Sequence, residues 1–230
     1  MPIDYTKRPQ APAPADAAPA GAAPAGAAPR KVTLTKASPT VSLTKSGGGG
    51  GVLRVNLNWT SRPSSGGFLR KREPDVDLDL GCLYEFTGGR KGVVQALGNA
   101  FTVTAPGAAS PTIWLDGDDR SGSNSAGENL YVDLAQAASI TRVLVFAYIY
   151  KGSANWAAAD GLVTLTPVSG PSIEVRLDEP RDGARTCAIA LLTPTGGDLA
   201  VRREVRYIDG TQAQLDAAYD WGIRWGVGRK

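Results

Sequence analysis

The sequence contains no histidine, and this absence limits the chemistry that the protein can perform. Without an imidazole there is no Ser-His-Asp triad and no Cys-His dyad, and most zinc sites are excluded as well. The remaining candidates for acid, base or nucleophilic catalysis are carboxylates, lysine, tyrosine and cysteine. The sequence therefore directs attention to clusters of acidic side chains.

Cysteine and long apolar runs are also scarce. The two cysteines, Cys82 and Cys187, lack the spacing of metal ligands, and both are predicted to be small buried hydrophobes rather than redox centres. The longest uninterrupted apolar run, Val143–Tyr150, is far too short to span a bilayer. A net charge of +3 is too small to indicate nucleic acid. These features predict a soluble, intracellular protein with no transmembrane segment and no nucleic-acid partner.

Large side chains are nearly absent from the first 30 residues. Ala11–Pro29 consists almost wholly of alanine, proline and glycine, so no apolar burial offsets the entropy of ordering this stretch. Lys7 and Arg8 are followed by small residues broken by proline rather than by an apolar core, which argues against a signal peptide. Residues 1–30 are therefore predicted to be a disordered Pro/Ala-rich tail, and residues 31–230 a single domain.

The remainder of the 230 residues alternates between apolar and polar side chains in short runs separated by glycine and proline. Leu53–Trp59 is the clearest strand, and Val143–Tyr150 is apolar on both faces, as in a central strand. Thr211 and Gln214 have capping-box spacing and predict a short helix, and Trp221–Val227 alternates like a final strand. This pattern predicts an all-β fold, a β-sandwich of two mainly antiparallel sheets with one or two short helices.

A dense group of acidic residues occupies the stretch from Asp116 to Asp133. Asp116, Asp118 and Asp119 place three carboxylates within four residues, and Glu128 follows after several serines and an asparagine. Close carboxylates repel one another, and a calcium ion would relieve this repulsion by collecting six to eight oxygens. A solvated turn is the alternative, because these residue types are common in loops. The spacing does not match an EF-hand.

A second acidic pattern lies in the segment DVDLDL, which begins at Asp75. Its strict period of two predicts a strand with the valine and both leucines toward the core, so Asp75, Asp77 and Asp79 share the opposite face. A solvated strand face is one interpretation. Aspartate is a poor strand former, however, and a cation shared with the Asp116 loop would explain three of them in register.

The chain resembles the tellurium-resistance family, specifically its TerD-type domain and the TerA-like branch. The matching motifs span most of the predicted domain: VSLTK from Val41, the Leu53–Trp59 strand, DLDL from Asp77, DGDDRSG from Asp116, GENLYVDL from Gly127, FAYIY from Phe146 with Gly152 and Ala154–Trp156, CAIALL from Cys187, and WGIRWGVG from Trp221. The resemblance implies a calcium-binding β-sandwich associated with resistance to tellurite and other chemical stress, and no enzymatic activity.

The resemblance also implies which residues would bind Ca²⁺. The family's paired aspartates on a strand correspond to Asp77 and Asp79, and its loop acids to Asp119 and Glu128; spacing alone adds Asp116 and Asp118. The chain departs from the family pattern in one respect. Arg120, Ala126 and Gly127 stand where the commoner pattern has an amide and two acids, which weakens the expectation of a second site.

We therefore expect a calcium-binding, non-enzymatic stress-response protein that acts as a binding scaffold in the cytoplasm. Its expected partners are other stress-response proteins, including a complex peripheral to the inner face of the membrane. The main alternative is a C2-like or lectin-like module that uses calcium to bind membrane or glycan, assisted by the basic residues Arg70–Arg72.

Two chemical alternatives remain. Asp77, Asp79 or Glu128 could act as the acid and base of a hydrolase, although no other catalytic signature accompanies them. Attack of Cys82 or Cys187 on tellurite would require an exposed thiol of lowered pKa, and both lie in apolar strand sequence.

Overall fold

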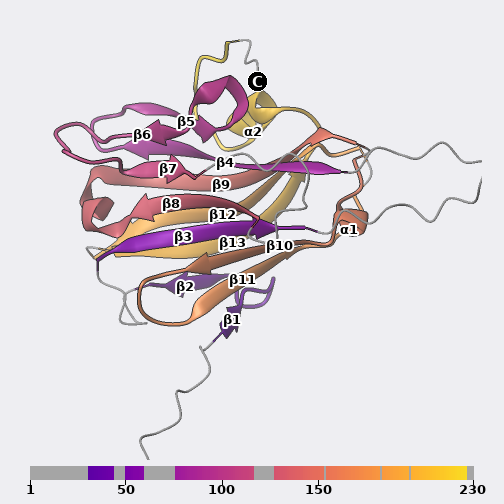
Figure 1. Ribbon diagram of the computed structural model, residues 1–230, viewed down its shortest axis with the longest axis horizontal. Coiled ribbons are helices and arrows are strands. Elements are labelled where there is room, and N and C mark those ends of the chain that lie inside the picture. The colour runs from indigo at the N-terminus through magenta and orange to yellow at the C-terminus, as the bar shows by residue number, and fades with distance from the viewer. Residues whose placement is uncertain are drawn as a thin grey trace, which may run out of the picture.

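The computed structural model describes residues 31–43, 50–59, 76–116, 127–152, 154–181, 183–196 and 198–226. Within these ranges the chain forms thirteen strands, which are divided between a seven-stranded and a six-stranded sheet, and a few short helices (Figure 1). The prediction of an all-β sandwich is confirmed. The tail predicted for residues 1–30 lies outside the described residues, so that prediction and the single-domain boundary remain predictions.

The seven-stranded sheet has the order β1-β11-β10-β3-β8-β7-β6. All of its ladders are antiparallel except the pairing of β1 with β11. Its strands are β1 (Lys31–Thr33), β3 (Val52–Asn58), β6 (Thr102–Val103), β7 (Ile113–Leu115), β8 (Glu128–Asp133), β10 (Gly161–Thr166) and β11 (Ser172–Leu177).

The six-stranded sheet has the order β2-β13-β12-β9-β4-β5, and its ladders are all antiparallel. Its strands are β2 (Thr40–Ser42), β4 (Asp77–Phe86), β5 (Lys91–Gln95), β9 (Ile140–Lys151), β12 (Thr186–Thr195) and β13 (Asp198–Ile208). The long apolar strand β9 lies between β4 and β12, which explains why its sequence is apolar on both faces.

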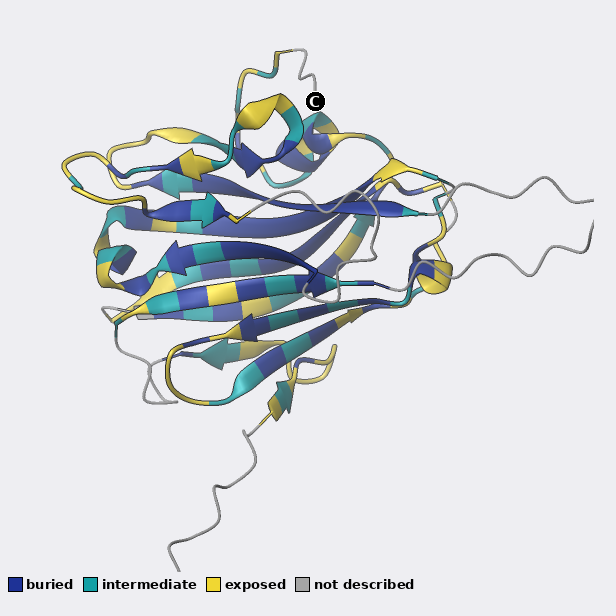
Figure 2. Ribbon diagram, viewed as in Figure 1, coloured by how far each residue is buried: buried dark blue, intermediate teal, exposed yellow. Residues whose placement is uncertain are grey.

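The main core lies between the two sheets. Alternate residues of each strand point inward, so Leu53, Val55 and Leu57 of β3 meet Leu78 and Leu80 of β4 in one buried cluster. Figure 2 shows the resulting alternation along β3 and β10, in which buried positions are separated by intermediate or exposed ones. Burial of apolar surface, worth about 25 cal/mol per Å², holds the two layers together.

The outer face of the six-stranded sheet carries a second, smaller core. Leu83, Phe146 and Leu215 belong to it, together with the fully buried Trp221. The helix α2 (Gln212–Ala218) and the segment 221–226 cover this face, and Figure 1 shows α2 near the top of the view, to the right of β5. The other helical segments are η2 (Leu97–Asn99), η3 (Leu134–Ser139) and α1 (Trp156–Ala159). In the described part of the chain no helix is long and apolar enough to cross a membrane.

The capping-box prediction is confirmed, whereas the predicted last strand is wrong. Thr211 accepts a hydrogen bond from the backbone of the first turn of α2, and the side chain of Gln214 bonds back to the backbone N–H of Thr211. Residues 221–226, by contrast, pair with no strand in the described ladders. Side-chain hydrogen bonds hold this segment instead, as described below.

Candidate functional site

The first residues of β4 carry two buried carboxylates. Asp77 is 3% exposed and Asp79 is fully buried, so the interpretation of a solvated strand face is wrong for these two residues; Asp75 lies outside the described residues. The alternation of β4 places Leu78 and Leu80 in the main core, as predicted. Asp79 pairs across the ladder with Tyr148 of β9. Strand β5 pairs with β4 only from Gly81 onward, so the edge of β4 beside these acids is not covered by β5.

Glu128, the first residue of β8, reaches this edge of β4. Its carboxylate oxygen Oε2 accepts a hydrogen bond from the backbone N–H of Leu80 at 2.6 Å, and its side chain is 2% exposed. A hydrogen bond to a carboxylate is charge-assisted and therefore stronger than one between neutral groups. Glu128 thus connects the two sheets at the residue that follows Asp79.

Gly127 allows the chain to enter β8 in this position. Its φ of 64° lies in the left-handed region, and a Cβ there would collide with the carbonyl oxygen of Leu57 in β3. Leu57 is the residue that pairs with Glu128 in the β3–β8 ladder. Only glycine permits so close an approach without displacing β3. The residue immediately before the glutamate therefore fixes where its carboxylate lies.

Three buried carboxylates on two neighbouring elements concentrate negative charge at one end of the sandwich. Ionised carboxylates are almost never fully buried unless a cation or strong hydrogen bonds stabilise them. Their oxygens are hard ligands of the kind that calcium prefers. The donor chemistry of Asp77, Asp79 and Glu128 therefore fits Ca²⁺. Within the described residues, however, no group of three or more acidic or cysteine side chains is close enough to hold a metal alone.

Asp116 lies on the other face of β8. Its carboxylate accepts hydrogen bonds from the backbone and side-chain N–H groups of Asn129, at 3.3 and 2.8 Å, and from the Tyr131 hydroxyl at 3.2 Å. Asn129 and Tyr131 alternate with the inward-facing Glu128 and Leu130, so the structure does not bring Asp116 together with the acids of β4. Asp118 and Asp119 lie outside the described residues.

The sequence analysis did not identify the outer polar network around Asp116. The carboxamide oxygen of Asn129 accepts hydrogen bonds from Arg54 Nε at 2.8 Å and from Asn56 Nδ2 at 2.9 Å. Trp114 stacks on Tyr131 with ring centroids 5.3 Å apart. Burial and the neighbouring Asp116 carboxylate raise the pKa of Tyr131. The sequence feature that could have indicated this network is the alternation of Asn129 and Tyr131 with apolar residues, which places both side chains on one outer face of the strand.

The two cysteine thiols are inaccessible to a dissolved ion such as tellurite. Cys82 and Cys187 are free and fully buried. Burial raises the pKa of both thiols well above the ordinary value. A reactive cysteine needs an accessible thiolate, and neither buried cysteine provides one. The structure therefore argues against attack of Cys82 or Cys187 on tellurite. The prediction that both are small buried hydrophobes is confirmed.

Comparison with known proteins is consistent with this architecture. The chain is 42% identical over 222 residues to the tellurium resistance protein TerA of Alcaligenes sp., a match that covers 95% of the chain and 64% of that relative. The chain thus spans slightly less than two thirds of the length of this curated relative. No protein-family model matches the chain.

Two solved structures share the fold. A protein of unknown function, SAV2460, superposes with a TM-score of 0.55 at 16% identity, covering 76% of this chain and 99% of its own. A homologue of the telluride resistance protein TerD from Streptomyces coelicolor A3(2) superposes with a TM-score of 0.51 at 22% identity, covering 72% of this chain and 94% of its own. At these identities the likeness concerns the fold alone.

Proposed function

Because the chain belongs to the tellurium-resistance family of TerD type, we propose that it contributes to tellurite and chemical stress resistance as a calcium-binding, non-enzymatic protein. The observation that carries this proposal is the burial of Asp77, Asp79 and Glu128 on two adjacent elements. A bound cation would offset the repulsion among these groups.

We propose that Asp77, Asp79 and Glu128 supply the protein's fixed oxygen ligands. Asp118 and Asp119 would complete the oxygen set, since calcium takes six to eight ligands. Glu128 accepts a hydrogen bond from the Leu80 N–H, which fixes the orientation of its carboxylate. Calcium would supply positive charge and crosslink β4 to the stretch that precedes β8. The protein would then present one edge of the sandwich, in a calcium-dependent form, to other stress-response proteins.

Thermal melting of the full chain with calcium, and then with chelator, tests the site. A ligand present at one hundred times its dissociation constant stabilises the folded state by about 2.7 kcal/mol. In a domain of this size the midpoint should rise by roughly 5 to 10 °C. We expect Asp79→Asn and Glu128→Gln to abolish the shift, and magnesium not to reproduce it.

Asp116→Asn is the matched comparison, because its carboxylate lies on the outer face of β8. If the inner acids and the following loop bind the ion, this variant keeps the calcium shift. If only Asp116→Asn loses the calcium-dependent melting shift, the calcium site lies on the outer face of β8 instead. An unchanged midpoint in the wild-type chain at saturating calcium would contradict the proposal.

A further inference from the structure

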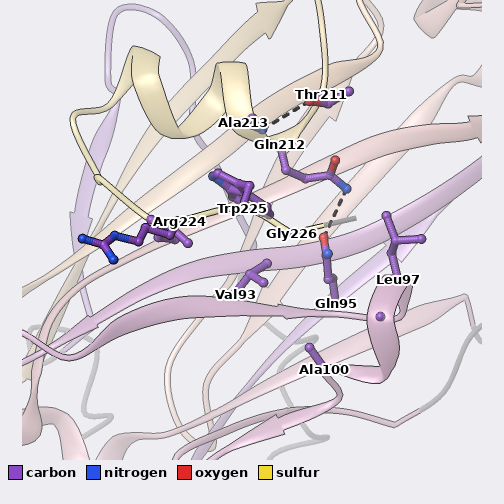
Figure 3. Close-up of a pocket in the computed structure, with 12 residues that line it drawn as sticks. Val93, Gln95, Leu97, Ala100, Thr211, Gln212, Ala213, Arg224, Trp225 and Gly226 are labelled. Carbon is purple, nitrogen blue, oxygen red and sulfur yellow. Dashed lines mark hydrogen bonds between the residues drawn. The ribbon is translucent and has the colours of Figure 1, made fainter. Parts of the chain in front are cut away.

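A pocket of about 500 Å³ lies on the outer face of the six-stranded sheet, and its lining does not include Asp77, Asp79 or Glu128. Its walls come from β5, the η2 turn, the start of α2 and the segment 221–226 (Figure 3). The apolar lining includes Val93, Leu97, Ile223 and Trp225. This volume is within the range of small-molecule sites, which are typically 300 to about 1,000 Å³.

A pair of buried carboxamides lies in the lining of this pocket. Gln212 Nε2 donates to Gln95 Oε1 at 3.1 Å, and the two residues are 7% and 5% exposed. Figure 3 shows their amide tips pointing toward one another, with Leu97 beside Gln95. The residues come from β5 and α2 and are 117 positions apart in the chain. Only the tertiary structure creates this pair.

Each amide retains unused hydrogen-bonding capacity. Among the hydrogen bonds of the described residues, none uses Nε2 of Gln95 or Oε1 of Gln212, although a primary amide offers two donors and an accepting oxygen. Rotation of both amides by 180° leaves the same combination, one unused donor group and one unused oxygen. The pocket therefore presents a donor and an acceptor to whatever occupies it.

The walls around the pair are held rigidly. The Asp216 carboxylate accepts hydrogen bonds from the backbone N–H groups of Gly222 and Ile223, each at 2.8 Å, and from Trp225 Nε1 at 3.0 Å. The indole N–H of Trp225 is thus already used, so the ring offers the pocket its apolar surface. The capping box at Thr211 fixes the first turn of α2, which carries Gln212.

The lining also carries little charge. Of the described residues around the pocket, Arg224 alone is charged, and Figure 3 shows its guanidinium directed away from the two glutamines. An ionic ligand would therefore gain no compensating charge beside the amide pair. A flat ring can pack against Trp225 and the aliphatic side chains, as aromatic groups commonly do.

We propose that this pocket binds an uncharged, planar ring that bears an amide group, through the Gln95–Gln212 pair and the surface of Trp225. The carbonyl of such a ligand accepts from Gln95 Nε2, and its N–H donates to Gln212 Oε1. Trp225, Val93 and Leu97 contact the ring. This binding activity is independent of the calcium site and uses none of its residues.

Nicotinamide is a suitable probe, because it joins an aromatic ring to one primary amide. We expect it to produce saturable shifts in the side-chain amide signals of Gln95 and Gln212 and in the indole N–H signal of Trp225, in ¹H–¹⁵N spectra of the full chain. For so small a ligand the dissociation constant should be on the order of a millimolar. N,N-dimethylnicotinamide keeps the ring but lacks both N–H groups, and should bind about tenfold more weakly.

Two variants separate pocket binding from folding. Gln212→Met keeps the side chain's length but removes both hydrogen-bonding atoms, and should weaken nicotinamide binding about tenfold. Ala213→Leu places a larger side chain in the lining on a helix that accepts leucine well, and should block the ring without altering the amide pair. Gln136→Met, the same change in η3 and outside the pocket lining, should leave binding unchanged and controls for loss of stability.

The proposal is overturned if nicotinamide gives no saturable shifts up to tens of millimolar. It is equally overturned if Gln212→Met and Ala213→Leu, both shown to be folded, bind as tightly as the wild type. The calcium-dependent melting shift should persist in both variants, so failure of this inference and failure of the calcium proposal are distinguishable.

Discussion

Asp216 is the residue whose replacement should most clearly expose how the C-terminal segment is held. Its carboxylate is 5% exposed and accepts three hydrogen bonds from residues 222, 223 and 225. Arg142 binds the preceding turn, with its guanidinium 3.8 Å from the ring centre of Trp221 and hydrogen bonds to the carbonyl oxygens of Tyr219 and Asp220. Since these residues pair with no strand of the described sheets, such contacts replace a ladder.

Asp216→Asn keeps the side chain's shape but removes its charge and replaces one accepting oxygen with an NH₂ group. Hydrogen bonds to charged groups contribute about 1.5 to 3 kcal/mol each, so three set an upper limit of roughly 4 to 9 kcal/mol. One oxygen remains in the variant, and the contributions are not additive. We expect a loss of about 3 kcal/mol in the free energy of unfolding, or roughly 6 to 12 °C in melting midpoint.

Urea denaturation monitored by tryptophan fluorescence measures this loss. Asp178→Asn is the matched control, because Asp178 is exposed and surface changes of this kind usually alter stability by less than about 0.5 kcal/mol. The reasoning is refuted if Asp216→Asn loses less than about 1 kcal/mol relative to this control, because the three hydrogen bonds would then contribute little. Hydrogen exchange should also accelerate at residues 222 and 223 before global unfolding.

Three further outcomes are expected. Gly127→Ala should destabilise the fold by about 2 kcal/mol or more in the same urea assay, since the methyl group collides with the backbone of β3; a change below 0.5 kcal/mol would contradict the close approach. Cys82 and Cys187, whose thiol pKa values burial raises, should resist a thiol reagent at neutral pH and react after unfolding; rapid labelling of the native chain would contradict this. Tyr207 and Tyr219 also have raised pKa values, chiefly through burial, and the nearby Glu204 carboxylate adds to the rise for Tyr219. The unfolded chain therefore ionises first, and the free energy of unfolding should fall as the pH rises above about 10, the ordinary tyrosine pKa; urea midpoints constant from pH 9 to 11 would refute it.

The two candidate sites differ in how far the sequence could reveal them. The acids of β4 were visible as a regular pattern, and the strand prediction correctly placed Leu78 and Leu80 in the main core. Alternation alone assigned Asp77 and Asp79 to the opposite face and left a solvated surface open as an interpretation. Both are nevertheless buried in the folded chain, while Glu128, 48 positions from Leu80, bonds to the backbone of β4. A period of two identifies a face but not what covers it.

The amide pocket left no comparable signal. Gln95 and Gln212 stand in unrelated motifs, and a lone glutamine in a strand or in a first helical turn predicts nothing about binding. For the segment from Trp221 the sequence did contain a pattern, but the pattern was misleading. Its regular alternation suggested a strand, whereas hydrogen bonds to Asp216 and from Arg142 hold this part of the chain. An extended conformation gives the same alternation whether the backbone pairs with a strand or with side chains.

The sequence by itself therefore determined the fold class, the inward-facing residues of the central strands, the capped helix α2 and the acidic groups worth testing. All of these depend on local periodicity or on residues within one turn, which neighbouring positions specify. The tertiary structure alone decided that Asp77 and Asp79 are buried, that Asp116 faces outward, and that Gln95 meets Gln212. Each of these results depends on which distant segments pack together, because burial and hydrogen-bond partners are properties of the packed chain and not of any single stretch.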